Sequence, residues 1–309
     1  MTSVRSGLAG FTFAFFCRAI ASAQAGDLNL HDGVWEDHTS GGALVSLSAG
    51  AMTGMAREYA YDPTTGAKLS ELDWNMKVSE TLNLEMTAKI NSQFRVYVNG
   101  SVALNGDNYM DDYDWITSTA PAPASDHSWH DDTRLDHYYS IDAGGRYSVA
   151  AFDRNTVSVL GGLRYTDIQF SAYGGCLNYT SPLIGGPIAG CIQPGLLGIT
   201  YQQKLPAVYG GVGFEHAGDT WSTSLVGTAG FSVDSDSLDH HWLRGLVFEN
   251  IGSPSPFVAA KAKIGYSLSN RAMLFLKGDY QHFFQMRDGD SGGMSLETLN
   301  VSAGASYKF

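Results

Sequence analysis

Hydrophobic and polar residues alternate along most of this chain, and the period is two residues rather than the three to four of a helix. In residues 296–309, small and apolar residues such as Val301, Ala303 and Tyr307 tend to fall on one face. Such alternation predicts β-strands, because successive side chains of a strand point to opposite faces. We predict ten strands, near residues 44–61, 68–79, 82–104, 138–152, 156–175, 202–216, 219–234, 257–268, 272–286 and 296–309.

The segments between these strands are of two kinds, which alternate strictly. Short turns are predicted at 79–81, 153–155, 216–219 and 269–271, and longer polar or Pro/Gly-rich loops at 62–67, 105–137, 176–201, 235–256 and 287–295. This order is typical of an outer-membrane barrel. The expected fold class is all-β: a ten-stranded antiparallel transmembrane β-barrel with short periplasmic turns and long extracellular loops. A soluble β-sandwich is the alternative fold.

The N-terminus has the features of a secretory signal. Arg5 precedes an apolar run, and Ala23-Gln24-Ala25 is a small-x-small cleavage site. We therefore expect residues 1–25 to be a signal peptide and residues 26–309 to form the barrel, in the outer membrane of a Gram-negative bacterium. No later run of 18 or more apolar residues occurs, which argues against transmembrane helices.

The charge balance narrows the choice of partner. Removing residues 1–25 removes Arg5 and Arg18 from the 19 basic residues and leaves all 31 acidic ones. Such an excess of negative charge disfavours nucleic acid and favours cationic partners.

Two cysteines remain after the signal peptide, Cys176 and Cys191, in one predicted loop. In an exported chain this pattern predicts a disulfide, although two free thiols remain the alternative. The bond would contribute roughly 3 kcal/mol in the chain-entropy model.

Two short acidic segments, at residues 110–115 and 239–242, carry the candidate chemistry. Asp112 and Asp114 share one face of an extended chain, and Asp239 and His241 share another. Charges are costly on a lipid-facing surface, so both pairs should face the lumen or mouth and could meet across a cleft. His241 would be a general base oriented by Asp239, with Asp112 and Asp114 helping to hold a water. The alternative is that both pairs only solvate loops.

Other catalytic patterns are weaker. One histidine-rich loop could suggest a metal site, but its spacing matches no ordered zinc pattern, so no metal is expected; its residues are His127, His130, Asp131, Asp132 and His137. No GxSxG motif appears, and no phosphate-binding loop follows a strand.

At these residues the sequence resembles the omptin family of outer-membrane proteases. The matching segments are Asp112-Tyr113-Asp114-Trp115, Asp239-His240-His241, Glu71-Leu72-Asp73-Trp74 and residues 199–204. The resemblance extends over nearly all of the chain after the signal peptide.

The resemblance implies an aspartate/histidine endopeptidase in which activated water cleaves a peptide bond at or between basic residues, without an acyl-enzyme. It assigns catalysis to Asp112, Asp114, Asp239 and His241, and substrate binding to Glu58, Asp126, His130 and Tyr179. The expected partners are basic peptides or proteins and outer-membrane lipid. No cofactor is expected, although lipopolysaccharide could be an activator bound in part by Lys204, and the protein is expected to be a monomer.

Two positions depart from the family pattern. The second acid of the basic-residue pocket falls on Ser237, and one lipopolysaccharide-binding position falls on the acidic Asp167.

Two other functions remain open: a surface adhesin that binds cationic host peptides or matrix proteins without cutting them, and a small porin.

Overall fold

The computed structural model describes residues 42–184, 186–289 and 291–309, so the predicted signal peptide at 1–25 lies outside the described residues. Fourteen strands are present there: β1 (Gly42–Tyr61), β2 (Lys68–Lys89), β3 (Phe94–Asp114), β4 (Asp126–Phe152), β5 (Asn155–Tyr173), β6 (Cys176–Tyr179), β7 (Ile188–Cys191), β8 (Leu197–Ala217), β9 (Trp221–Ser232), β10 (Ser235–His241), β11 (Leu246–Gly252), β12 (Pro256–Ser267), β13 (Ala272–Asp288) and β14 (Gly292–Lys308). A short 3₁₀ turn, η1 (Pro182–Ile184), lies between β6 and β7. Within the described ranges no helix is long and apolar enough to cross a membrane.

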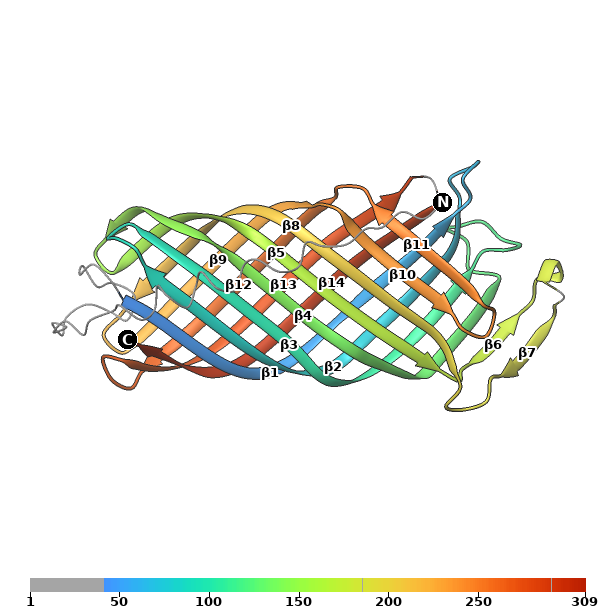
Figure 1. The fold of residues 1–309 in the computed structure, drawn as a ribbon, viewed down its shortest axis with the longest axis horizontal. Coiled ribbons are helices and arrows are strands. Elements are labelled where there is room, and N and C mark those ends of the chain that lie inside the picture. Colours follow the sequence, from blue (N-terminus) through green and yellow to red (C-terminus); the bar gives the residue numbers. More distant parts are fainter. Residues whose placement is uncertain (1–41, 185, 290) are drawn as a thin grey trace, which may run out of the picture.

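Ten of the strands close into an antiparallel ring, which confirms the predicted fold class. The order around the ring is β1, β2, β3, β4, β5, β8, β9, β12, β13 and β14. The closing pair is β14 with β1, in register from Leu44 opposite Lys308 to Ala60 opposite Gly292. The four remaining strands form two hairpins, β6–β7 and β10–β11, which lie at the end of the barrel opposite the C-terminus (Figure 1).

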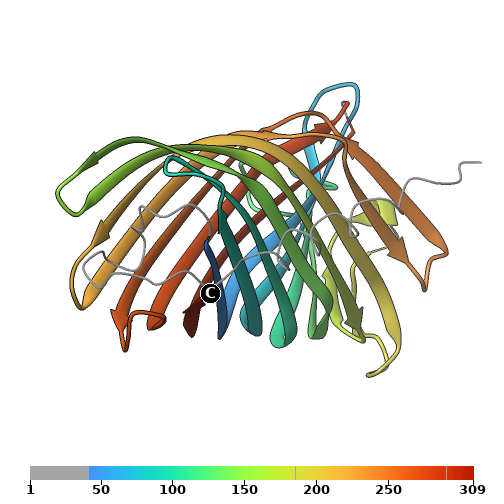
Figure 2. The same ribbon diagram turned by 60° about the vertical axis from the view of Figure 1, so that its left-hand side comes forward.

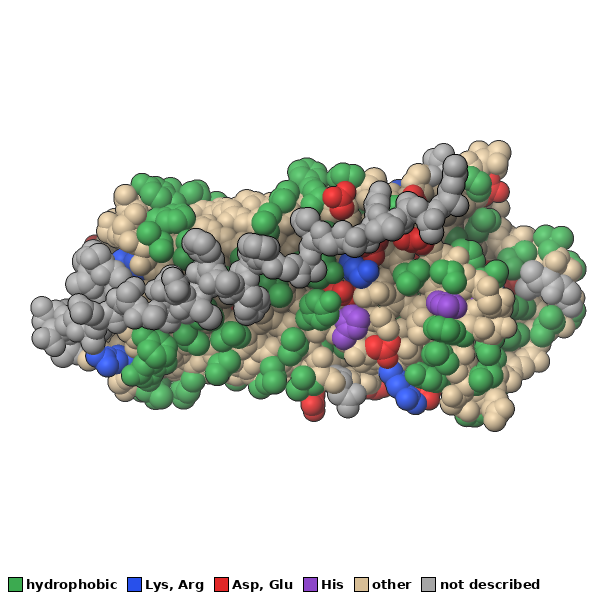
Figure 3. Space-filling model, in the orientation of Figure 1, with side chains coloured by type: hydrophobic (Ala, Val, Ile, Leu, Met, Phe, Trp, Pro, Cys, Tyr) green, Lys and Arg blue, Asp and Glu red, His purple; other side chains and the backbone are tan. Residues whose placement is uncertain are grey.

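The barrel wall has polar side chains on its inner face and apolar side chains on its outer face, which is the reverse of a soluble protein. Along β1 the polar Ser46 and Ser48 point inward and are buried, whereas Leu47 between them is 63% exposed on the outside. Figure 3 shows hydrophobic side chains over the part of the surface nearer the C-terminal end, and Asp, Glu and His side chains toward the end with β6 and β7. Such an outer apolar band is what the bilayer interior requires of a barrel.

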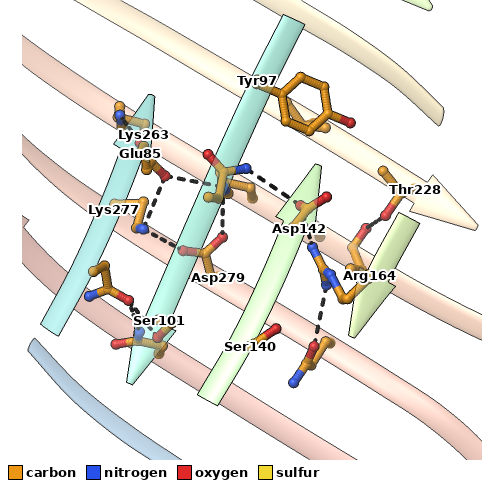
Figure 4. A pocket seen from close by; sticks show the side chains of 18 of the residues that line it. Glu85, Tyr97, Ser101, Ser140, Asp142, Arg164, Thr228, Lys263, Lys277 and Asp279 are labelled. Atoms are coloured by element: carbon orange, nitrogen blue, oxygen red, sulfur yellow. Dashed lines mark hydrogen bonds and ion pairs between the residues drawn. The ribbon is translucent and has the colours of Figure 1, made fainter. Parts of the chain in front are cut away.

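Ion pairs, some across the lumen and some between neighbouring strands, line a pocket in the membrane-spanning part of the barrel (Figure 4). Glu85 accepts hydrogen bonds from Lys261 and Lys277, each at 3.1 Å, and from Lys263. Arg164 donates to Asp142 at 2.9 Å. These paired side chains occupy much of the interior with polar groups, as expected for a barrel of this size and not for a wide porin.

One predicted turn is wrong. Instead of turning at 79–81, β2 runs on to Lys89, and the turn lies at residues 90–93, where the side chain of Asn91 accepts the N–H groups of Gln93 (2.9 Å) and Phe94 (2.8 Å). The strand contains irregularities in register near Met76 and Thr81, which disturb the alternation without ending the ladder.

Three predicted loops are shorter than expected because strands extend beyond the membrane. The predicted loop 105–137 is reduced to 115–125, and the loops at 176–201 and 235–256 contain the β6–β7 and β10–β11 hairpins. In these parts both strand faces meet water or polar groups, so the hydrophobic alternation stops. The backbone hydrogen bonds between the strands nevertheless continue.

Candidate active site

The ring divides into two walls at the end that bears the hairpins. The first residues of β8 pair with β10, and only its later residues pair with β9. In the same way, residues 126–129 of β4 pair with β6, whereas β4 pairs with β5 from Asp132 onward. The β10–β11 hairpin therefore continues the β8 wall, and β6–β7 continues the β4 wall (Figures 1 and 2). Predicted catalytic residues lie on both of these walls, and we refer to the space between the walls as the cleft.

The first wall carries Asp239 and His241 on β10. Both side chains are buried, and His241 Nε2 lies 2.5 Å from Asp239 Oδ2. A carboxylate accepts, so this contact places the imidazole proton on Nε2 and leaves Nδ1 as the acceptor. The alternation of the strand turns His240 to the other face, where it stacks on Trp242 at 3.7 Å.

The second wall carries Asp112 and Asp114 near the end of β3. Their partners on β2 are Leu72 and Ser70, and the Ser70 hydroxyl donates to Asp112 at 3.2 Å. Burial and the adjacent charge of Asp114 raise the pKa of Asp112 well above its usual value. Burial also raises the pKa of Asp114, against the opposing effects of Ser70 and Arg244. The pair therefore holds a proton to a higher pH than two exposed carboxyl groups would.

Charged groups on the two walls are close enough to influence each other. After burial and nearer groups, the negative charge of Asp239 contributes to the raised pKa of Asp112. His241 acts in the opposite direction on Asp114. The structure thus brings together the four residues that the sequence assigned to catalysis.

Aromatic and amide side chains form the floor of the cleft. Trp74 of β2 is fully buried and stacks on Phe170 of β5 and Tyr201 of β8, each at 5.5 Å between ring centres. The Tyr201 hydroxyl donates to the carbonyl of Arg57 at 3.2 Å, and Gln203 Nε2 donates to the same oxygen at 3.0 Å. These contacts cross the lumen from β8 to β1 and fix the distance between the walls.

Glu58 points inward at the base of the cleft. It is 6% exposed, and among the described residues its Oε2 atom has no hydrogen-bond partner. Burial, and then the charges of Asp239 and Asp112, raise its pKa well above the usual value. A cation placed beside Glu58 would offset the repulsion that its carboxylate feels from Asp239 and Asp112. This carboxyl is therefore suited to bind a basic side chain.

The other predicted substrate-binding residues lie on β4 and β6. Asp126 accepts the backbone N–H groups of Thr180 (2.6 Å) and Ser181 (2.9 Å), so it anchors the start of the β6–β7 connection. Burial, and then the charge of Asp112, raise the pKa of Tyr179 to about 12, which keeps its hydroxyl protonated beside the cleft.

His130 is buried on the inner face of β4, and burial lowers its pKa. Its ring packs against the backbone of Gly175, where an added Cβ would lie 2.4 Å from Nδ1. The φ of +105° at Gly175 also requires glycine. The chain therefore folds closely around this imidazole.

The predicted lipopolysaccharide-binding positions lie on the outer wall. Lys204 is 3.5 Å from Asp236, which faces outward as the alternation requires. Asp167 is buried among donors: His137 at 2.8 Å, Tyr139 at 2.7 Å and Gln202 at 2.8 Å. Its carboxylate is thus already satisfied by neighbouring side chains.

The predicted disulfide is present. Cys176 and Cys191 are bonded and are opposite each other in the β6–β7 hairpin. The bond closes the hairpin that Asp126 anchors at its other end.

Comparison with known proteins decides the family. The sequence model of the Omptin family matches residues 40–309. The chain belongs to the omptin family. Family membership confirms two coarse expectations, an outer-membrane location and a peptidase activity.

Named relatives agree with this assignment. The omptin is 24% identical over 282 residues to the plasminogen activator of Yersinia pestis, covering 86% of this chain and 89% of that protein. It is 24% identical over 281 residues to the outer membrane protease OmpP of Escherichia coli K12, covering 85% and 89%. In fold it is similar to the crystal structure of the outer membrane protease OmpT from Escherichia coli, with a TM-score of 0.76 at 19% identity, covering 93% of this chain and all of that one.

Sequence reasoning missed three residues of the site. Tyr201 and Gln203 belong to the segment 199–204, which resembles the family, but no role was assigned to them. Arg244 lies in the turn after β10, and its Nη2 donates to His241 Nδ1. Its position three residues after His241 is the only sequence signal that could have drawn attention to it.

Proposed function

We propose that this omptin is an endopeptidase that uses an aspartate/histidine site to direct water at a peptide bond. The observation that supports the proposal best is the buried His241–Asp239 pair, which faces the Asp112–Asp114 pair across one cleft. A general base and a group that holds water are what such a hydrolysis requires.

In the proposed mechanism, His241 Nδ1 accepts a proton from a water held between the walls. The Nε2–H of His241 stays hydrogen-bonded to Asp239, which stabilises the imidazolium that forms. The water oxygen attacks the peptide carbonyl, and the imidazolium then gives its proton to the departing amine. Asp112 and Asp114 would orient the water on the other side, and a proton retained by the pair could stabilise the oxygen on which negative charge develops.

The basic side chain of the substrate would extend to Glu58 at the base of the cleft. A guanidinium there could form two hydrogen bonds with one carboxylate, a geometry that favours arginine. The surrounding burial would strengthen the pair because little water competes for it.

The test is digestion of a basic peptide by the purified protein in detergent micelles, followed by mass spectrometry. We expect cleavage next to arginine or lysine. An adhesin without peptidase activity would bind the peptide and leave its mass unchanged, and that result would reject the proposal.

We also propose that the reaction needs no cofactor, that the monomer is active, and that lipopolysaccharide contributes little. On the outer wall a lipid phosphate would meet the negative carboxylate of Asp167. That carboxylate already accepts the hydrogen bonds that the neighbouring side chains can donate. Activity measured with and without lipopolysaccharide should differ by less than about tenfold, which corresponds to about 1.4 kcal/mol. A complete dependence on lipopolysaccharide would contradict this part of the proposal.

A further inference from the structure

Arg244 places a positive charge of the protein itself inside the cleft. It lies in the turn that joins β10 and β11, where its backbone N–H donates to the carbonyl of His241 at 3.2 Å. Its Nη2 atom donates to His241 Nδ1 and lies 3.3 Å from Nε2. The same charge reaches the other wall, since it opposes the raised pKa of both Asp112 and Asp114. The guanidinium therefore contacts the base on one wall and acts electrostatically on the acid pair of the other wall.

This contact has a direct effect on the base. Nδ1 is the nitrogen left to accept a proton once Nε2 bonds to Asp239, and at rest Arg244 occupies it. A water that approaches Nδ1 has to displace the guanidinium. The turn is exposed, so little packing opposes that displacement.

The cleft offers few free acids to a second cation of the substrate. At position 237 a serine is buried, and its hydroxyl accepts from Asn250 at 3.3 Å. The carboxylate of Asp126 accepts two backbone N–H groups and the hydroxyl of Ser125 at 2.6 Å. Two buried carboxylate oxygens of the site have no hydrogen-bond partner among the described residues, Glu58 Oε2 and Asp239 Oδ1. Asp239 is already paired with His241 through its other oxygen, so Glu58 is the carboxyl left to bind a cation.

Apolar side chains line the cleft on the β11 side. In the β10–β11 ladder Leu246 is opposite His241 and Phe248 is opposite Asp239, so both side chains share the inner face with the catalytic pair. They are 43% and 47% exposed, and the Phe248 and His241 rings lie nearly perpendicular, with 5.6 Å between their centres. An exposed apolar surface beside a catalytic group is suited to an apolar substrate side chain.

We infer that this omptin cuts beside a single basic residue and prefers an apolar residue, not a second basic one, on the other side of the scissile bond. The inference rests on the proposed peptidase function. Glu58 would take the basic side chain, and Leu246 and Phe248 would contact the apolar one. Arg244 would repel a second cation, because like charges brought together in a partly desolvated site weaken binding strongly.

The test uses four peptides with identical flanks that contain Arg-Leu, Arg-Phe, Arg-Arg or Arg-Lys at the cleavage position. For the unchanged protein we expect kcat/KM for Arg-Leu and Arg-Phe to exceed that for Arg-Arg by about tenfold or more. Arg244→Gln should reduce this ratio by about tenfold, and Ser237→Asp in addition should make Arg-Arg the better substrate. Leu243→Gln, in the same exposed turn, is the matched control and should leave the ratio unchanged.

The ratio between peptides is the readout, so a general loss of activity in a variant does not obscure the result. Preferred cleavage of Arg-Arg by the unchanged protein, or an unchanged ratio in Arg244→Gln, would overturn the inference while leaving the peptidase function intact. Failure to cut any of the four peptides would reject the proposed function and the inference together.

Discussion

The imidazole of His241 and the carboxylate of Asp239 form a pair with 2.5 Å between Nε2 and Oδ2, and both side chains are buried. Because the two residues are separated by one position on β10, the strand alone brings them to the same face. The pair therefore depends on local geometry, whereas its position opposite Asp112 depends on closure of the barrel.

The first prediction concerns this pair. His241→Ala and Asp239→Asn should each lower kcat/KM on a basic peptide by about 10²- to 10⁴-fold, the range that general acid–base catalysis contributes. The barrel should stay folded, as judged by its β-sheet circular dichroism and its thermal transition in detergent. His240→Ala, which changes the outward neighbour, is the control and should keep most of the activity.

The second prediction concerns Glu58. Glu58→Gln should lower kcat/KM for peptides with arginine at the cleavage site by about 10- to 100-fold, because a hydrogen bond to a charged group contributes about 1.5–3 kcal/mol. Discrimination between arginine and norleucine at that position should fall in parallel. Glu249→Gln, an exposed acid on β11, provides the control. Unchanged discrimination in Glu58→Gln would exclude Glu58 from recognition of the basic side chain.

The third prediction concerns the pH dependence of stability. The pKa of Asp112 is raised in the folded protein, so its contribution to stability is fully present below the unfolded pKa near 4 and is lost as pH rises through the folded pKa. Asparagine does not ionise, so Asp112→Asn removes this loss of stability at higher pH. Between about pH 5 and pH 8, the melting temperature of the unchanged protein should therefore fall relative to that of the variant.

The exposed Asp131→Asn makes the same change in charge and serves as the control, for which the difference in melting temperature should stay nearly constant with pH. A melting temperature of the unchanged protein that rises relative to that of Asp112→Asn between about pH 5 and pH 8 would contradict the raised pKa.

The fourth prediction concerns the floor of the cleft. Trp74→Ala should destabilise the protein by about 3–5 kcal/mol, since it opens a cavity beneath two stacked rings. Activity should fall as well, because Tyr201 and Phe170 lose their support. Trp74→Phe keeps a ring in place and removes an indole N–H that has no partner among the described residues, so its cost should be clearly smaller. Equal losses in free energy of unfolding would show that the floor does not depend on ring stacking.

The errors in the strand prediction have a common physical cause. Alternation is strong only where one face meets lipid, as at Leu47 between Ser46 and Ser48. Beyond the membrane both faces are polar, so the sequence gives no sign that β3 continues to Asp114 or that residues 235–252 form a hairpin. The misplaced turn at 79–81 arose where irregular register interrupts the alternation, whereas the actual turn is stabilised by one side chain, Asn91.

The hydrogen-bond partners of individual charged residues could not be predicted from the sequence, for a related reason. The spacing of Asp126 relative to Asp114 is visible in the chain, but the hydrogen bonds that Thr180 and Ser181 donate to it join residues more than fifty positions apart. In the same way, no local pattern indicates that the Arg244 side chain turns back onto His241.

The sequence alone determined the alternating strands, the number of strands in the ring and the pairing of residues two positions apart. Each of these depends on the two-residue repeat of an extended chain. Tertiary structure decided the rest. Closure of the ring brings β3 opposite β10, and the contacts of Trp74, Tyr201 and Gln203 fix how far apart the walls stand. Distances between residues remote in the chain are set by packing across the lumen, and no local repeat encodes them.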